Sequence, residues 1–213
     1  MSLAVTGASG FVGWALCLEA LAKGLKVRPV TRRPCDLSVG EASFVVGPIH
    51  ESTDWSAALA SCSAVVHLAA RVHVMADKSA DPLAEFRRVN VDGTLNLARK
   101  AAAAGVKRFV FVSSVKVNGE ATQLGQPFEA DAAPAPLDAY GVSKMEAEQG
   151  LRAIAAQAGM DVVIIRPPLV YGPGVKANFA ALMHAVQRGW PLPLGAIHNQ
   201  RSLVALDNLV DFI

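Results

Sequence analysis

Three glycines at intervals of three, directly between an apolar run and a helical pattern, constrain the fold of this chain most strongly. The stretch Thr6-Gly-Ala-Ser-Gly-Phe-Val-Gly13 follows the apolar residues Ser2–Thr6 and precedes a helical periodicity over residues 11–23. Glycines at these places permit a tight turn and let backbone N–H groups approach a pyrophosphate at the positive end of a helix. The sequence therefore predicts a dinucleotide-binding loop formed by Gly7, Ser9, Gly10, Phe11, Val12 and Gly13.

The rest of the chain repeats this alternation of strands and helices. Residues 27–31 and 43–46 form short apolar runs, and residues 64–70 are apolar enough for a parallel strand that is buried on both faces. This rhythm predicts an α/β fold with a Rossmann-type doubly wound parallel sheet. We expect the later elements to be helices at 81–104, 138–156 and 177–188 and strands at 107–112 and 161–166.

We expect the chain to have two parts. Residues 1–170 form the dinucleotide-binding domain, and residues 171–213 begin a smaller substrate-binding region, where Pro and Gly become frequent after Gly189. The chain stops at Ile213 within a helix that starts at Asp207, so we expect this region to be incomplete. Residues 113–137 contain many polar, Gly and Pro residues, which is typical of a loop over a site.

Composition excludes several classes of protein. The formal net charge is +2 without any dense Lys/Arg run, which argues against nucleic-acid binding. Cys17, Cys35 and Cys62 are odd in number and lack a metal-binding spacing, which indicates a reduced cytoplasmic compartment. No apolar run is long enough to span a bilayer, so we expect no membrane association.

The end of the second predicted strand bears on the choice of cofactor. NAD-binding folds of this kind place an acidic residue there for the adenosine ribose, whereas this chain has Thr31 followed by Arg32 and Arg33. A missing carboxylate removes repulsion toward a 2′-phosphate, and a guanidinium can pair with that phosphate. The sequence therefore favours NADP over NAD.

Tyr140 and Lys144 are the candidate acid/base pair. In a helix they lie one turn apart on the same face, and a neighbouring ammonium stabilises a phenolate and lowers its pKa. A Tyr-x-x-x-Lys pattern alone is a common surface helix turn, but here it accompanies the glycine loop and the pair Ser113-Ser114. His67 and His73 have no further metal ligand at a suitable spacing, so we interpret them as packing residues and predict no metal.

These motifs together resemble the extended short-chain dehydrogenase/reductases, the NAD-dependent epimerase/dehydratase family. Further stretches that carry the resemblance are His67-Leu-Ala-Ala70, Asn90-Val-Asp-Gly-Thr94, Arg166-Pro-Pro-Leu-Val-Tyr-Gly-Pro173 and Arg201-Ser-Leu-Val-Ala-Leu-Asp207. The resemblance implies that Tyr140 exchanges a proton with a sugar oxygen, that Lys144 holds the nicotinamide ribose, and that Ser114 orients the same oxygen.

The resemblance also implies the remaining binding residues and the partners. Leu68, Ala69 and Ala70 would line the cofactor, with Asn90 in a mainly structural role there. Asn178 and Arg201 would contact the diphosphate of a nucleotide sugar, which is the implied substrate. The helices at 81–104 and 138–156 would pair with those of a second copy in a homodimer.

Departures from the family narrow the expected reaction. The family's dehydratases have an Asp-Glu pair after the catalytic hydroxyl residue, whereas Val115-Lys116 follow Ser114, so we expect no dehydratase activity. Pro48 replaces an acidic residue near the adenine, and Leu169 replaces an Asn that binds substrate in many epimerases.

Three functions remain open at this stage. Thr31 and Arg32 favour an NADPH-dependent reductase of a 4-keto nucleotide sugar. The alternative is a nucleotide-sugar 4-epimerase, which keeps its cofactor bound. A non-catalytic NADP-binding sensor on the same fold is the third possibility, although the combination of Ser114, Tyr140 and Lys144 argues against it.

Overall fold

The computed structural model describes residues 2–35, 43–72, 79–123, 125–193 and 195–213. His73, which we expected to pack in the core, lies outside these residues. None of the described helices has the length and apolar character needed to cross a bilayer. Cys17 and Cys62 are buried, and Cys35 is exposed.

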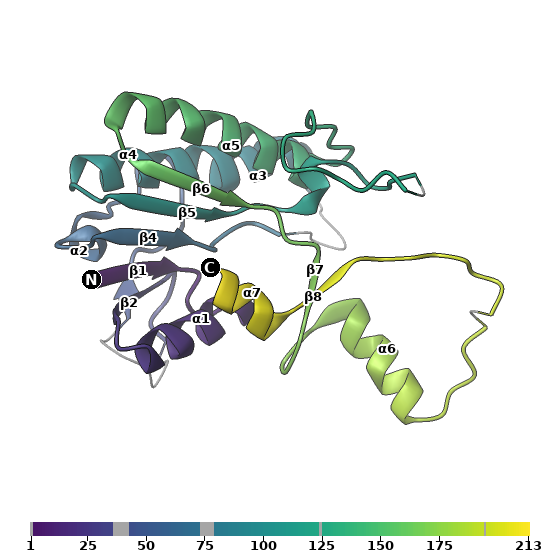
Figure 1. Cartoon of the computed structure of the whole chain (residues 1–213). Helices are drawn as coiled ribbons and strands as arrows, with labels where there is room; N and C mark the ends of the chain where they lie inside the picture. The colour runs from purple at the N-terminus through teal and green to yellow at the C-terminus, as the bar shows by residue number, and fades with distance from the viewer. Residues whose placement is uncertain (1, 36–42, 73–78, 124, 194) are drawn as a thin grey trace.

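Six parallel strands form the central sheet in the order β3-β2-β1-β4-β5-β6. The order runs in opposite directions on the two sides of β1, so the predicted doubly wound parallel sheet is confirmed (Figure 1). The strands are β1 (Ser2–Thr6), β2 (Lys26–Thr31), β3 (Phe44–Val45), β4 (Ala64–His67), β5 (Arg108–Val112) and β6 (Asp161–Ile165).

Helices cover both faces of the sheet. The helices α1 (Phe11–Ala22) and α7 (Leu206–Phe212) lie on one face, and α4 (Thr94–Ala103) and α5 (Ala139–Ala158) lie on the other, near the short α2 (Ser56–Leu59) (Figure 1). Alternate residues of a strand point to opposite faces. Val65 accordingly packs in the core beneath α4 and α5, while its neighbour Val66 packs in the core beneath α1.

The helix predicted at 81–104 is continuous but not uniform. It consists of α3 (Pro82–Phe86), the π-helical segment η1 (Arg87–Gly93) and α4. The carboxylate of Asp81 caps its start by accepting the N–H of Ala84 at 3.0 Å. A π-helical turn holds one more residue than an α-helical turn, and here the segment carries Asn90 toward the interior.

The C-terminal residues form a small second sheet that the sequence did not predict. Strand β7 (Leu169–Tyr171) pairs in parallel with β8 (Leu203–Ala205). Between them, α6 (Ala177–Gln187) and the segment after it extend away from the main sheet (Figure 1). The chain then returns to α1 through α7, whose Leu209 is buried in the same core as Leu16. The predicted domain boundary at 170/171 falls inside β7.

Candidate active site

The glycine-rich loop lies between β1 and α1, where the sequence predicts it. Gly7 has a positive φ of 70°, and a Cβ added at Gly13 would lie 2.2 Å from the Gly7 carbonyl oxygen. Glycine alone fits such a contact, so the first turn of α1 packs directly on the loop. Gly10 precedes α1 without a capping side chain, which leaves the first N–H groups of the helix for an anion. The loop fits a pyrophosphate.

The chain after β4 runs beside this loop. A Cβ at Gly7 would lie 2.9 Å from the nitrogen of Ala69, and the Ala69 N–H donates to the Thr6 hydroxyl at 3.3 Å. These contacts place the predicted cofactor residues at the switch point between β1 and β4, where dinucleotides bind in such sheets. The residues concerned are Leu68, Ala69 and Ala70.

His67 is a core residue, as predicted. Its side chain is 1% exposed, and its two ring nitrogens lie 2.6 Å and 2.9 Å from the hydroxyls of Thr6 and Thr94. Burial, together with the charge of Lys144, lowers the pKa of His67 to about 3. The ring is therefore neutral near neutral pH, and both of its nitrogens have hydrogen-bonding partners.

Thr31 and Arg32 lie at the carboxyl end of β2, next to β1 and the glycine loop. Thr31 is buried, and its hydroxyl donates to the Arg33 carbonyl at 2.9 Å. Arg32 is exposed. The side chain of Arg32 is thus free to approach a ligand at this edge, while Thr31 shapes the turn. Their contact with the adenosine ribose stays a prediction.

The first turn of α5 positions Tyr140. The carboxylate of Asp138 accepts the N–H of Gly141 at 2.6 Å and so caps the helix. The ring of Phe86 meets the Tyr140 ring edge-on at a centroid distance of 6.0 Å. Because α5 is helical from Ala139 onward, Lys144 lies one turn beyond Tyr140, as predicted.

Lys144 is turned into the protein. Its side chain is 2% exposed, and its Nζ donates to the Val112 carbonyl at 2.8 Å and lies 4.2 Å from the centroid of the Phe111 ring. Burial lowers the pKa of Lys144 to about 7, although the carboxylate of Glu148 acts in the opposite direction. This lysine can therefore change its charge near neutral pH.

The expected effect of Lys144 on Tyr140 is wrong for the protein alone. Burial and the charge of Asp138 raise the pKa of Tyr140 to about 12, and Lys116 is the cation that lowers it. The Lys144 ammonium donates to the Val112 carbonyl at the end of β5, and burial is the largest influence on Tyr140. The protein alone holds Tyr140 as a phenol at neutral pH.

The structure separates the roles of Ser113 and Ser114. The hydroxyl of Ser113 is buried and donates to Glu148 at 2.6 Å. Ser114 is half-buried, and its hydroxyl accepts the N–H of Lys116 at 3.2 Å, at the start of the 3₁₀ turn η2 (Val115–Val117). Ser114 is therefore the more accessible residue of this pair, and its contact with substrate stays a prediction.

Asn90 has a structural position. Its amide exchanges hydrogen bonds with the backbone of Arg71, accepting from N–H at 2.8 Å and donating to the carbonyl at 3.0 Å. It also donates to the Ser143 hydroxyl at 3.0 Å. Asn90 thus connects the chain after β4 to α5 through hydrogen bonds, and it holds in place the segment that follows the predicted cofactor residues Leu68, Ala69 and Ala70.

The two predicted diphosphate residues, Asn178 and Arg201, lie in the segment between β7 and β8. Arg201 lies exposed just before β8 and makes no hydrogen bond or ion pair within the described residues. Asn178 lies in α6, but its side chain is outside the described residues. Their contact with substrate stays a prediction.

Comparison with known proteins identifies the family. The model of the NAD dependent epimerase/dehydratase family matches residues 3–213. The chain belongs to this family. It is 51% identical over its whole length to a UDP-glucose 4-epimerase of Vibrio cholerae, of which it covers 65%. It is also 33% identical to a dihydroflavonol 4-reductase of Zea mays, over 97% of the chain and 64% of that relative.

A solved structure shows the same arrangement of chain. MoeE5 in complex with UDP-glucuronic acid and NAD superposes with a TM-score of 0.84 at 33% identity, over 99% of this chain and 70% of MoeE5. The chain spans less than two thirds of the length of the two relatives named above. Among the described residues, no group of three or more His, Cys, Asp or Glu side chains is arranged to hold a metal ion.

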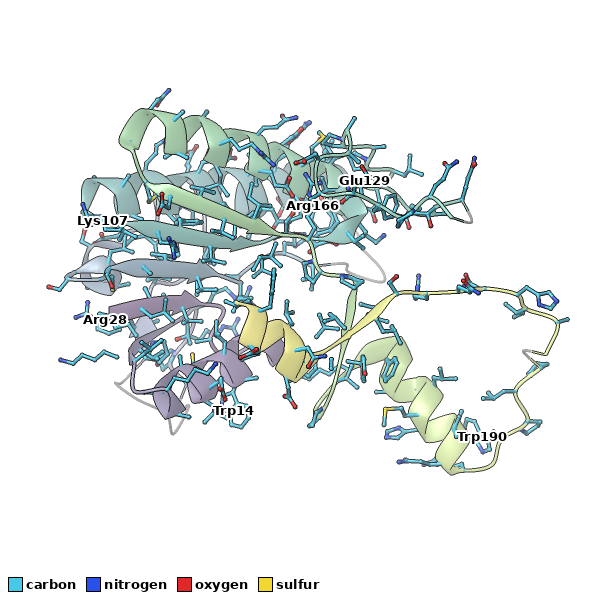
Figure 2. The ribbon with its side chains drawn as sticks, in the orientation of Figure 1. Trp14, Arg28, Lys107, Glu129, Arg166 and Trp190 are labelled. Carbon is cyan, nitrogen blue, oxygen red and sulfur yellow. The ribbon has the colours of Figure 1, made fainter. Side chains whose placement is uncertain are left out.

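Sequence reasoning missed three residues that support this epimerase-family site. Glu148 is 2% exposed. Its carboxylate accepts a hydrogen bond from the Ser113 hydroxyl, and two guanidinium nitrogens of Arg166 donate to it at 2.9 Å and 2.5 Å. Figure 2 shows Arg166 beside the loop that carries Glu129. Lys116 is the third, through its ion pair with Asp138. The buried charges could have been found from the four-residue spacing of Lys144 and Glu148, which places both on one helix face.

Proposed function

We propose that this chain carries the catalytic residues of an NAD-dependent 4-epimerase that acts on a nucleotide sugar. The observation that carries the proposal is the position of Lys144 and Ser114 at the carboxyl end of β5, with Tyr140 one turn before Lys144, in a chain 51% identical to a UDP-glucose 4-epimerase. The glycine loop follows β1 at the same edge of the parallel sheet. The NAD and UDP-sugar in the MoeE5 complex support the same class of ligands.

Each residue has a distinct task in this reaction. When bound, NAD would accept a hydride from C4 of the sugar and return it to the opposite face. Tyr140 would take the proton from the oxygen at C4 and give it back. The Ser114 hydroxyl would hydrogen-bond the same oxygen and hold it in line with Tyr140. Lys144 would bind the ribose of the cofactor through the N–H groups that Val112 leaves unused.

The glycine loop and Lys144 fit a nicotinamide dinucleotide on structural grounds. The contact between Gly13 and Gly7 leaves the backbone of the loop open to a ligand. An epimerase returns its hydride, so it gains from holding the oxidised cofactor throughout. We therefore favour a bound NAD, and the preference for NADP that Thr31 and Arg32 indicate is left to direct measurement.

A 4-ketoreductase is the second candidate. It is supported by the similarity to the maize dihydroflavonol 4-reductase and by Arg32, which suits an exchangeable NADPH. In that reaction Tyr140 would act only as the acid that protonates a ketone oxygen. The epimerase is better supported because the relative with that activity is much more similar.

Product analysis tests the proposal. The full-length protein is incubated with NAD⁺ and UDP-glucose, and UDP-galactose is quantified by chromatography. We expect interconversion without net change in reduced cofactor, and loss of at least about a hundredfold in kcat for Tyr140→Phe. Tyr171→Phe is the matched control, because Tyr171 lies in β7 and is the second of the two tyrosines. Net oxidation of NADPH with a UDP-4-keto sugar, and no epimerisation, would establish the reductase instead.

A further inference from the structure

Lys116 connects the segment that carries Ser114 to the helix that carries Tyr140. Its ammonium lies 2.5 Å from Asp138 and 2.9 Å from Glu120. The side chain of Lys116 is 37% exposed and that of Asp138 is 28% exposed, so this ion pair is only partly screened by solvent. Because Asp138 caps α5, the cation is bound to the residue that fixes the first turn of that helix.

The backbone of Lys116 makes the same connection. Its N–H donates to the Ser114 hydroxyl at 3.2 Å. A Cβ added at Gly141 would lie 2.9 Å from the Lys116 carbonyl oxygen, so α5 packs directly against this residue immediately after Tyr140. Lys116 therefore contacts the Ser114 hydroxyl and the first turn of α5, which carries Tyr140.

Two neighbouring elements supply the charges nearest to the first turn of α5. The helix α5 itself supplies Lys144 and is preceded by Asp138, and η2 supplies Lys116, with Glu120 behind it. The third neighbour, α3, presents the uncharged ring of Phe86. The guanidinium of Arg71, from the chain after β4, lies over this ring at 5.5 Å from its centroid and is a further charge near the site. Asp138 raises the pKa of Tyr140 and Lys116 lowers it, so the two partners of the ion pair act on the phenol in opposite directions.

We propose that Lys116 is a positioning residue for Tyr140: it fixes the first turn of α5 against the Ser114 segment and supplies the positive charge that favours the phenolate. The inference rests on the proposed function, because Tyr140 and Ser114 are the reacting groups there. A role in packing alone would need only the apolar stem of Lys116. The proposal requires its charge.

A spectroscopic titration tests the charge without any substrate. Residues 1–213 contain two tyrosines, so each variant is made in the Tyr171→Phe background, and the spectrum of a protein that also carries Tyr140→Phe is subtracted to isolate the signal of Tyr140. Its tyrosinate absorbance is measured at alkaline pH values at which circular dichroism shows the native fold. We expect Lys116→Gln to reduce the tyrosinate fraction by about three- to tenfold, which corresponds to about half to one pH unit.

Asp138→Asn is the decisive companion variant. Asn caps helices as well as Asp does, so this change removes the charge and keeps the cap. We expect it to increase the tyrosinate fraction, and we expect Lys116→Arg to leave the fraction unchanged. Lys107→Gln, at the opposite end of the sheet from Arg166 in Figure 2, is the matched control with no expected effect. Shifts of the same sign in Lys116→Gln and Asp138→Asn, or no shift in either, overturn the proposal.

The pH profile of kcat provides the second readout. With UDP-glucose, the acidic limb should move to higher pH in Lys116→Gln and to lower pH in Asp138→Asn, because the reaction begins with the phenolate. If the acidic limb of the kcat profile stays at the same pH in both variants, the proposal is also overturned. If the wild-type protein does not epimerise UDP-glucose but the opposite tyrosinate shifts are observed, the proposed function fails and the inference about Lys116 is supported.

Discussion

Arg32 is the residue at which the choice of cofactor can be measured directly. It is exposed at the carboxyl end of β2, and no carboxylate occupies the neighbouring position Thr31. If its guanidinium pairs with a 2′-phosphate, Arg32→Ala should weaken NADP⁺ binding by about tenfold, a loss of about 1.4 kcal/mol, and leave NAD⁺ binding unchanged. Calorimetric dissociation constants check this, with Arg33→Ala as the control. An equal loss of affinity for NADP⁺ and NAD⁺ in Arg32→Ala would show that Arg32 does not bind the 2′-phosphate.

His67 should make the protein sensitive to acid. Its native pKa is lowered to about 3 by burial and by the charge of Lys144, whereas an unfolded histidine titrates near ~6.5. The unfolded state therefore binds the extra proton between these values, and stability falls as pH falls through this window by about 1.4 kcal/mol per pH unit.

Urea unfolding of His67→Gln and wild type at neutral and mildly acidic pH checks this dependence. The variant should show a shallower loss of unfolding free energy with acid, even if it is less stable throughout. His184→Gln is the control, because His184 is exposed on α6. An unchanged slope in His67→Gln would assign the acid sensitivity to other groups.

At the scale of an element, the first turn of α1 depends on the absence of a side chain at Gly13. A Cβ there would lie 2.2 Å from the Gly7 carbonyl oxygen, so Gly13→Ala must displace the turn or the loop. We expect dinucleotide affinity to fall at least about tenfold, since the N–H groups that bind a pyrophosphate move. Gly195→Ala is the control, because its Cβ would meet no atom within 4 Å. Unaltered NAD⁺ affinity in Gly13→Ala would exclude the loop as the phosphate site.

The helix α5 is held to the sheet by the buried pair of Glu148 and Arg166, whose side chains are 3% and 12% exposed. Glu148→Leu removes the carboxylate that neutralises the Arg166 guanidinium and that accepts from the Ser113 hydroxyl, and we expect a loss of about 3–5 kcal/mol in unfolding free energy. The double variant with Arg166→Leu should recover part of that loss.

The exposed pair of Arg108 and Asp161 is the control for this comparison. Asp161→Asn should cost less than about 1 kcal/mol, since solvent-exposed ion pairs contribute little. Urea unfolding measures all of these variants. A loss in Glu148→Leu as small as that of Asp161→Asn would mean that α5 is held by its apolar contacts alone.

Sequence patterns predicted the elements better than the side-chain directions within them. The glycine loop and the helix at Tyr140 follow from local spacing, and both are confirmed. The alternation along a strand implies that Ser113 and Ser114 face opposite sides, but it does not say which side holds the site. That answer came from Glu148, a partner 35 residues away. The pKa of Tyr140 in the protein alone is raised instead of lowered, mainly by burial, which depends on packing that local spacing does not describe.

At the scale of the whole molecule, contacts between distant segments escaped prediction. Strands β7 and β8 have three residues each, and a pairing so short has no periodicity to detect. The return of α7 to α1 is likewise a contact between the two ends of the chain. Local patterns described the six-stranded sheet because each of its units has its own strand and helix signals.

The expected homodimer is also a property of the whole molecule. Helix α5 packs closely on α4, since a Cβ at Gly150 would lie 2.6 Å from the Leu95 side chain. Ala153, about one turn further along α5, is a small exposed residue. Two copies could approach closely across the face of α5 that carries Ala153, as the resemblance implies. Ala153→Glu would bury two carboxylates at such a contact and should produce monomers. Sedimentation equilibrium of the full-length protein measures this, with the exposed loop residue changed in Ala121→Glu as the control. A dimer that persists in Ala153→Glu would require the copies to meet through another surface, because a symmetric contact places this residue near its own counterpart.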